Sequence, residues 1–233
     1  MIKNIIFDLG GVLLDIDLAY CMQQMEALGL DLKALQQQGV PTPAGVKAAV
    51  LGEGLVANGV MHLYQVGGIS TPDFLEGVRK QCSPNTTTKD VLQAWNTCCI
   101  GIPQYRLNKI GELKQKGYRI YMLSNTNDAH WQDIKSRCFG GQANVEKYFD
   151  HVFLSQEMHL AKPNDDIFLK VLEDIGAKAD ECLFLDDSTT NVEAAQQLGF
   201  HTMKVETSKT QNGQVVGRPS KDWINEIEQV LNS

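Results

Sequence analysis

The 233-residue sequence predicts an α/β fold, a doubly wound and mostly parallel sheet that carries a small all-helical cap domain. Two observations support this class. From about residue 102 onward, short apolar runs that favour strands alternate with stretches of helical spacing, as is typical of a parallel sheet covered on both faces. Between the first apolar run and residue 102, only helical patterns occur. We therefore expect a Rossmann-like core at 1–16 and 102–233, and a cap domain at 17–101.

The first apolar run predicts a buried strand that ends in a polar loop. Ile5-Ile6-Phe7 is followed by Asp8 and then by the pair Gly10-Gly11, which favours a turn. Asp8 therefore lies at the carboxyl end of a strand, the edge at which open α/β sheets bind their ligands. Taken alone, such an acid is more simply explained as part of a loop after a core strand.

The segment after this strand has helical character. Apolar residues recur at close to helical spacing from Leu18 to Leu28, and Gly29 favours a stop. Further short helices are expected at 32–38, 44–56, 72–82 and 89–99, separated by Gly, Pro and Ser/Thr clusters. The third of these begins with Ser70-Thr71-Pro72, a capping residue followed by proline at the first helical position.

The remainder of the chain alternates between strands and helices. Strands are expected at 118–123, 151–154, 182–185 and 201–205, and helices at 104–116, 129–138, 164–176 and 191–198. The polar stretch 206–219 is expected to be a surface loop, and 220–231 an amphipathic helix that closes the core. The predicted sheet thus has one strand before the cap and four after it.

Composition excludes some classes of partner. The net charge of −7 argues against a surface for nucleic acid or for an anionic membrane, because both need a basic field. No apolar stretch approaches the roughly 20 residues that span a bilayer, and the N-terminus lacks a signal-peptide pattern. The six cysteines form no C-x-x-C pair, which favours reduced thiols. We expect a cytoplasmic protein, a monomer or a homodimer.

Chemically useful side chains follow three of the predicted strands. Asp8 follows the first strand, Ser124-Asn125 follow the strand at 118–123, and Asp186-Asp187 follow the strand at 182–185. Because right-handed crossovers keep the carboxyl ends of parallel strands on one edge of a sheet, these groups should face one crevice. Lys162 should join them, because a proline starts the next helix and leaves this lysine in the loop above the sheet.

This combination favours transfer of a phosphoryl group to a carboxylate. A carboxylate that attacks a phosphate is repelled by about 4 kcal/mol per unit charge pair at roughly 4 Å near a protein surface. A hard divalent cation such as Mg²⁺, held by oxygens of Asp8 and Asp187, would offset this repulsion. Lys162 would add a fixed positive charge, while the Ser124 hydroxyl and the backbone N–H groups after it would hold the phosphoryl oxygens.

Each of these parts has a simpler explanation on its own. Ser124-Asn125 is also typical of a helix cap, and Asp186-Asp187-Ser188 of a turn that caps the next helix. Lys162 is also typical of a solvent-exposed lysine before a helix that begins with proline. What favours a catalytic site is the joint occurrence of these groups, in this order and next to strand ends.

With these motifs, the chain resembles the haloacid dehalogenase-like hydrolase superfamily, in particular phosphatases with a helical cap inserted after the first strand. Within that branch it is most similar to sugar-phosphatase-like proteins. The resemblance covers almost the whole chain. It rests on four motifs: F-D-L-G-G-V-L-L-D with Asp8, L-S-N-T-N with Ser124, A-K-P with Lys162, and F-L-D-D-S-T-T-N with Asp186-Asp187.

The resemblance implies a role for each motif residue. Asp8 would be the catalytic nucleophile and would form an aspartyl-phosphate, which water then hydrolyses. Ser124 and Lys162 would be catalytic residues that bind the phosphoryl group, and Asn125 would also contact the substrate. The metal ligands would be Asp8, the backbone carbonyl of Gly10, and Asp186-Asp187, of which the second would be the principal carboxylate.

One position departs from the family pattern. Most phosphatases of this family have a second aspartate two residues after the nucleophile, which acts as general acid and base, and here that position is Gly10. The backbone carbonyl remains, but the proton donor is missing. General acid catalysis is typically worth about 10²–10⁴-fold in rate. Another group such as Asp15, a cap residue or water would have to substitute, or turnover of alkyl phosphates would be slow.

We therefore expect a Mg²⁺-dependent phosphoric monoester hydrolase that acts on a small phosphorylated metabolite, for which a sugar phosphate is one candidate. Two alternatives stay open. Gly10 favours a catalytically weak or inactive relic that binds a phosphorylated ligand, and a metal-independent haloacid dehalogenase also lacks the second acid, although it has no need of the pair Asp186-Asp187. Substrate choice should be set by the cap, where His62, Tyr64 and Arg79 are candidates to face the ligand.

Overall fold

The sheet at the centre of the molecule has the first strand of the chain in its middle. The computed structural model describes residues 1–31, 60–220 and 222–232. Five parallel strands follow the order β5-β4-β1-β6-β7. Their bounds are Asn4–Phe7 for β1, Arg119–Ser124 for β4, His151–Leu154 for β5, Cys182–Asp186 for β6 and His201–Lys204 for β7. The predicted division of the sheet, one strand before the helical stretch and four after it, is confirmed.

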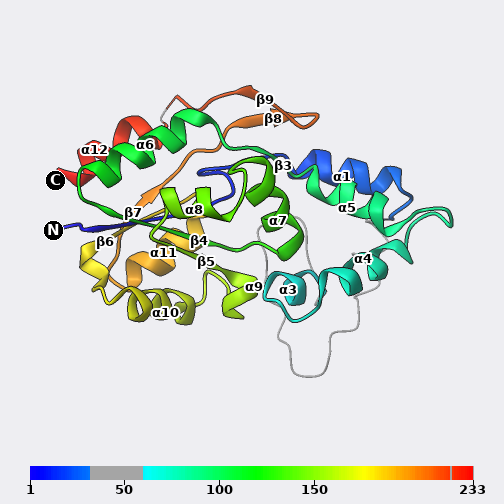
Figure 1. Ribbon diagram of the computed structural model, residues 1–233, viewed down its shortest axis with the longest axis horizontal. Coiled ribbons are helices and arrows are strands. Elements are labelled where there is room, and N and C mark those ends of the chain that lie inside the picture. Colours follow the sequence, from blue (N-terminus) through cyan, green and yellow to red (C-terminus); the bar gives the residue numbers. More distant parts are fainter. Residues whose placement is uncertain (32–59, 221, 233) are drawn as a thin grey trace.

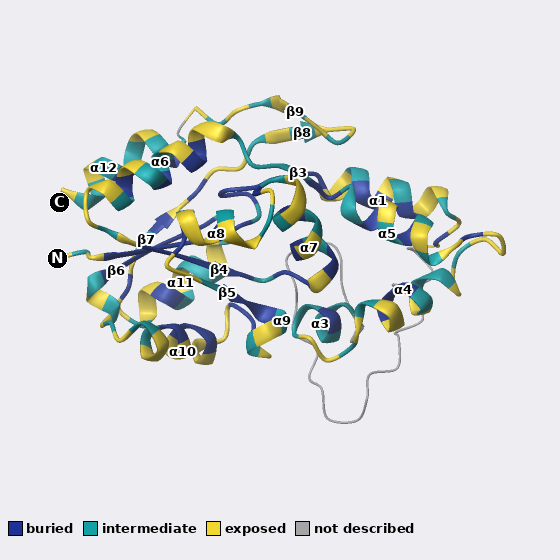
Figure 2. Cartoon of the chain, in the orientation of Figure 1, coloured by how far each residue is buried: buried dark blue, intermediate teal, exposed yellow. Residues whose placement is uncertain are grey.

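Helices cover both faces of this sheet (Figure 1). Successive residues of β1 point to opposite faces, so Ile5 and Phe7 pack into one hydrophobic cluster and Ile6 into another. The first cluster takes side chains from α6 (Gln104–Gln115), α7 (Asp128–Arg137), α8 (Gln142–Tyr148) and α12 (Trp223–Leu231), and the second from α10 (Asp165–Ile175) and α11 (Thr189–Gln197). The central strands β1, β4 and β6 are buried along most of their length (Figure 2). Burial on both faces explains why β1 and β6 consist mainly of apolar residues, and the helices on both faces confirm the doubly wound α/β class.

A group of helices lies beyond one end of the sheet, and we call it the helical block (Figure 1, right). It comprises α1 (Leu18–Ala27), α3 (Val60–Gln65), α4 (Thr71–Arg79) and α5 (Thr88–Asn96). As predicted, Ser70 caps α4 by accepting a hydrogen bond from the Asp73 backbone N–H, and a proline lies in the first turn. The helices predicted at 32–38 and 44–56 lie outside the described residues, and the limits 17–101 stay a prediction.

The link between this block and the sheet contains two strands that the sequence did not predict. β2 (Asp15–Ile16) pairs in antiparallel fashion with β3 (Cys99–Gly101). The helix expected at 89–99 is correspondingly shorter, since α5 ends at Asn96. Short helices at α3, α8 and α9 (Ser155–Met158) were not predicted either. None of the described helices is both long enough and apolar enough to cross a membrane.

The prediction of a surface loop at 206–219 is wrong. This stretch forms a hairpin of β8 (Lys209–Gln211) and β9 (Gln214–Gly217), whose tip residues Asn212 and Gly213 both have positive φ, as a tight two-residue hairpin requires. The hairpin contacts the start of the helical block at Asp17, the residue before α1. The Gly213 backbone N–H donates to Asp17 Oδ2 at 3.0 Å. The other oxygen of Asp17 caps α1. The tail therefore braces the helical block.

Asp15, in β2 and two residues before Asp17, is held in a buried ion-pair network. Its carboxylate is 3 % exposed and accepts from Arg106 at 3.1 Å and from Arg218 at 2.7 Å and 2.6 Å. The Ser208 hydroxyl donates to the same carboxylate at 2.9 Å. Because a buried carboxylate needs such partners, this network fixes β2 to α6 and to the tail. The sequence analysis named Asp15 as a possible substitute proton donor, but the structure commits both of its oxygens to these contacts.

A half-buried histidine joins α7 to the helical block. The His130 ring stacks on Trp95 of α5, with ring centroids 4.9 Å apart. Its Nε2–H donates to the Trp95 carbonyl at 3.0 Å, so its Nδ1 accepts from the Asn127 side-chain amide at 3.1 Å. The ring is therefore neutral, and burial lowers the pKa of His130 to about 4.

We expect His130→Gln to flatten the pH dependence of stability on the acid side of neutrality. Between the folded-state pKa of about 4 and the unfolded value of about 6.5, the unfolded chain binds a proton that the folded chain does not, so stability rises with pH. Acidification through this window therefore destabilises the wild type by up to about 3 kcal/mol, and the variant lacks this loss. Urea unfolding at about pH 7 and about pH 5 measures both slopes. His151→Gln, at an exposed position, should keep the wild-type slope; a His130 variant with that same slope would contradict the assignment.

Candidate active site

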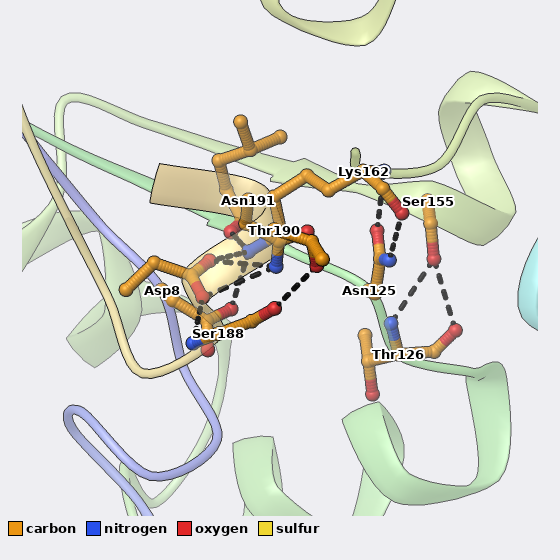
Figure 3. Close-up of polar contacts among 10 residues, drawn as sticks. Asp8, Asn125, Thr126, Ser155, Lys162, Ser188, Thr190 and Asn191 are labelled. Carbon is orange, nitrogen blue, oxygen red and sulfur yellow. Dashed lines mark hydrogen bonds and ion pairs between the residues drawn. The ribbon is translucent and has the colours of Figure 1, made fainter. Parts of the chain in front are cut away.

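Lys162 joins the ends of three neighbouring strands. Its Nζ donates to Asp8 Oδ1 after β1 at 2.7 Å, to Asp186 Oδ2 at the end of β6 at 2.6 Å, and to the Leu123 carbonyl of β4 at 2.9 Å (Figure 3). The side chain is 1 % exposed. An ammonium group has three hydrogens, so all of them are used. The predicted convergence of these residues at one sheet edge is therefore present in the structure.

The charges at this edge shift one another's protonation. Burial raises the pKa of Asp8 to about 7; Lys162 opposes this rise, while Asp186 and Asp187 add to it. Burial lowers the pKa of Lys162, but the attraction of Asp186 and Asp8 outweighs this effect, and the net shift is upward. The lysine therefore stays charged, and positive charge brought beside Asp8 would favour the ionised form of its carboxyl.

Asp186 is a scaffold for this lysine. It is fully buried, and both of its oxygens have partners besides Lys162. The Ser188 backbone N–H donates to Oδ1 at 2.7 Å, and the Asn191 side-chain amide reaches both oxygens at 3.1 Å. Asn191, in the first turns of α11, was missed by the sequence analysis, although it closes the quoted motif F-L-D-D-S-T-T-N.

Asp187 lies against the loop that follows β1. Its carboxylate approaches Gly11 so closely that a Cβ built on that glycine would lie 2.6 Å from Asp187 Oδ2. Gly11 also has a φ of +77°, a conformation that side chains disfavour. Lys204 donates to the Asp187 backbone carbonyl and fixes the loop from the other side. The sequence suggested only a turn at Gly11, whereas the structure shows that this glycine makes room for a carboxylate.

The donor set fits a hard divalent cation. Asp8, Asp186 and Asp187 each offer a carboxylate oxygen, and these oxygens lie within 4.8 Å of one another. With all three carboxylates ionised and the Lys162 ammonium beside them, the cluster carries two net negative charges, which a divalent ion would balance. Oxygen ligands of this type are those that Mg²⁺ prefers. Concentrating buried carboxylates without such compensation would be unfavourable.

Ser124 and Asn125 follow one another at the end of β4, and the side chain of Asn125 holds the backbone of Lys162. Ser124 ends β4, next to β1, and is buried. The Asn125 side chain donates from Nδ2 to the Lys162 carbonyl at 2.8 Å and accepts at Oδ1 from the Lys162 backbone N–H at 2.9 Å (Figure 3). Its amide is therefore committed to holding the backbone that carries the site lysine. Its predicted contact with the substrate stays a prediction.

Gly10 has open space around it. A Cβ at this position would meet only the Ile16 side chain, at 3.7 Å and 3.8 Å, which are ordinary van der Waals contacts. An isolated β-bridge to Leu14 holds the Gly10 backbone. The position thus has no steric need for glycine, unlike the neighbouring Gly11.

Comparison with known proteins agrees with this geometry. The chain is 29% identical to a D-ribitol-5-phosphate phosphatase of Bacteroides thetaiotaomicron, over the full length of both chains. It is similar to the crystal structure of a HAD family enzyme from the same species in complex with magnesium and inorganic phosphate, with 32% identity, a TM-score of 0.76, and coverage of 90% of this chain and 97% of that one. A predicted HAD-like family hydrolase of Porphyromonas gingivalis superposes with a TM-score of 0.78 and 28% identity, over 100% of this chain and 99% of that one.

A family model, haloacid dehalogenase-like hydrolase, matches residues 2–199, which include every residue of the site described above except Lys204. The match spans most of the sheet, the site lysine and the acid pair. The chain belongs to the haloacid dehalogenase-like hydrolase family.

Proposed function

We propose that this protein is a Mg²⁺-dependent phosphatase that hydrolyses a small phosphorylated metabolite, of the class of sugar or sugar-alcohol phosphates. The observation that carries the proposal is the contact of Lys162 with both Asp8 and Asp186 beside the carboxylate of Asp187. The full-length similarity to a ribitol-phosphate phosphatase and the likeness to a structure with magnesium and phosphate support it.

Asp8 is the nucleophile in this proposal. Lys162 binds Oδ1, so we assign the attack on phosphorus to Oδ2. The attack forms an aspartyl-phosphate and releases the alcohol of the substrate, and water then attacks the phosphorus and returns the free carboxylate. Lys162, held against Asp8 and Asp186, places its positive charge beside the phosphoryl group, the Ser124 hydroxyl binds a phosphoryl oxygen, and Asn125 keeps the Lys162 backbone in place.

The residues that would hold the metal in this proposal are Asp8, Asp187 and, through its backbone carbonyl, Gly10, with Asp186 as a further ligand or as a partner of the ligands. When bound, Mg²⁺ would supply the positive charge that offsets repulsion between the nucleophile and the phosphoryl group. The chain's own contribution is to hold the carboxylates close together. Lys162 binds those of Asp8 and Asp186, and Gly11 leaves room for that of Asp187.

The helical block serves as the cap in this proposal, with the core at 1–16 and 102–233 and the cap at 17–101. A cap that closes over the sheet edge would exclude water and contact the part of the substrate beyond the phosphoryl group. Tyr64, a candidate for such contact, is 2 % exposed and stacks on Phe74, so it serves packing. Arg79 pairs with Glu76 on the same helix.

A relic that binds a phosphorylated ligand without turnover is the second candidate. Gly10 favours it, because no acid stands at the position two residues after the nucleophile. A metal-independent dehalogenase is less well supported, because the three converging carboxylates suit a cation that such an enzyme does not need.

Purified protein should release phosphate from sugar and sugar-alcohol phosphates, including ribitol phosphate, only when Mg²⁺ is present. Asp8→Asn should lower this rate by about 10⁴-fold or more, because the nucleophile is lost. Asp166→Asn, which neutralises an exposed acid in the first turn of α10, should leave the rate unchanged. A phosphate-release assay, with circular dichroism to verify folding, measures all three proteins. Tight phosphate binding without release would favour the relic, and halide release without metal would favour the dehalogenase.

Gly10→Asp should accelerate hydrolysis of alkyl phosphates by about tenfold or more, since an alkoxide leaving group needs a proton and general acids supply such factors. The space around Gly10 admits the side chain. Aryl phosphates, whose leaving groups need little protonation, should respond less. Gly10→Asn is the matched control, because it has nearly the same shape but no acid. Equal rates for the two variants, or equal effects on both substrate types, would show that the missing acid does not limit turnover.

A further inference from the structure

The helical block touches the α/β core at a further place, away from the β2–β3 link and from His130. There, the carboxyl end of α3 lies against α9, which follows β5 directly (Figure 1). The approach is close enough that a Cβ on Gly67 would collide with the Gln156 carbonyl, so the backbones are in contact. Two core side chains bond to carbonyls that the end of α3 leaves unpaired. We call this contact the α3–α9 dock.

Ser155 is the first of these side chains, and it also touches the loop after β4. Its hydroxyl is fully buried and accepts from the Thr126 backbone N–H at 3.0 Å (Figure 3). The single hydroxyl hydrogen has two acceptors in reach, the Gln65 carbonyl of α3 at 2.6 Å and the Thr126 carbonyl at 3.1 Å. The shorter distance assigns the hydrogen to Gln65. One hydroxyl therefore links the helical block to the residue two positions after Ser124.

His159 is the second side chain, and its backbone is unusual. It has a φ of +57°, in the left-handed region, where a residue with a side chain is strained and glycine is not. Its ring Nδ1–H donates to the Val66 carbonyl at 2.8 Å. His159 is the C-cap of α9, and a left-handed residue commonly ends a helix in this way. Through its ring, the residue that ends α9 also contacts Val66, directly after α3.

The loop after β4 links the α3–α9 dock to Lys162. From Thr126, the chain runs back to Asn125, whose amide holds the Lys162 backbone on both its N–H and its carbonyl. In the other direction, the Ala129 backbone N–H donates to the Tyr64 hydroxyl of α3 at 3.0 Å. The segment 124–129 is thus held by α3 at two points and holds Lys162 at a third.

We propose that Ser155 and His159 are positioning residues, which make the placement of the segment 124–129, and through it of Lys162, depend on docking of α3 against α9. Neither residue lies in the four motifs or touches the reacting atoms. The inference rests on the proposed function, since it takes this segment and Lys162 as the binding site for the phosphoryl group. Docking of the helical block would then tighten phosphate binding even for a ligand too small to touch the block.

A double-mutant cycle with inorganic phosphate tests this coupling. Titration calorimetry in the presence of Mg²⁺ compares the wild type, Ser155→Ala, His159→Gly and the double variant. Each single change should weaken phosphate binding by about tenfold, the scale of one lost hydrogen bond. The double variant should be weakened by much less than the product of the two, because His159 acts through the link that Ser155 provides.

Replacing His159 with glycine distinguishes a positioning role, seen in phosphate affinity, from a role in stability, seen in the melting temperature. Glycine relieves the positive φ, so the melting temperature should stay equal or rise while phosphate affinity falls. Asn212→Gly relieves the other positive φ of a non-glycine residue in the described part of the chain, at the hairpin tip, and should leave phosphate affinity unchanged. Unchanged affinity in His159→Gly, or single effects that multiply in the double variant, would overturn the proposal.

A second readout does not depend on phosphate. Hydrogen exchange at the Thr126 amide should become at least several-fold faster in Ser155→Ala, which loses its acceptor, and also in His159→Gly, which acts only through docking. Faster exchange in both variants, together with a wild type that binds no phosphate, would support the coupling and refute the proposed function. Normal phosphate binding by the wild type with unchanged Thr126 exchange in His159→Gly would refute the coupling alone.

Discussion

The position of one buried ammonium group determines how the rest of this site is built. Lys162 reaches Asp8, Asp186 and the end of β4 at once, which is possible only because the three strands run parallel and end at the same level. Asp186 accepts further hydrogen bonds from Asn191 and Ser188, which fix its carboxylate in the position where it binds Lys162. With Asp186 fixed in this way, Asp8 and Asp187 are the carboxylates that the proposed function assigns to the metal and the phosphoryl group.

The sequence was sufficient for the sheet and for the motif residues, because both depend on local signals. Uniformly apolar runs that end in a polar residue mark buried parallel strands, and each such end carried an acid, a hydroxyl or an amide. β2 and β3 escaped prediction because two or three residues are too few to show a period. The β8–β9 hairpin is largely exposed and shows no apolar alternation, although the dipeptide Asn212-Gly213 is a known hairpin signal.

The site residues that were missed act through contacts distant in sequence. Gly11 is needed because of Asp187, which nothing near Gly11 in the sequence indicates. Ser155 after a strand resembles an ordinary helix cap until its bonds to Thr126 and Gln65 are seen. For Asp15 the sequence suggested a role that the structure does not support. This acid near the nucleophile was a candidate proton donor, but its carboxylate is bound to Arg106 and Arg218. Of the substitutes for the missing acid that the sequence analysis named, a cap residue and water remain as predictions.

The hairpin of the tail gives the helical block a fixed end. Asp17, at its root, is bound by the Gly213 N–H of the hairpin tip and, through its own N–H, by the Cys98 carbonyl. At another contact, the segment that ends α3 meets α9 through the hydrogen bonds of Ser155 and His159. The helical block is therefore attached to the core through residues far apart in the sequence, and the placement of α3 beside the loop after β4 depends on attachments made at separate places.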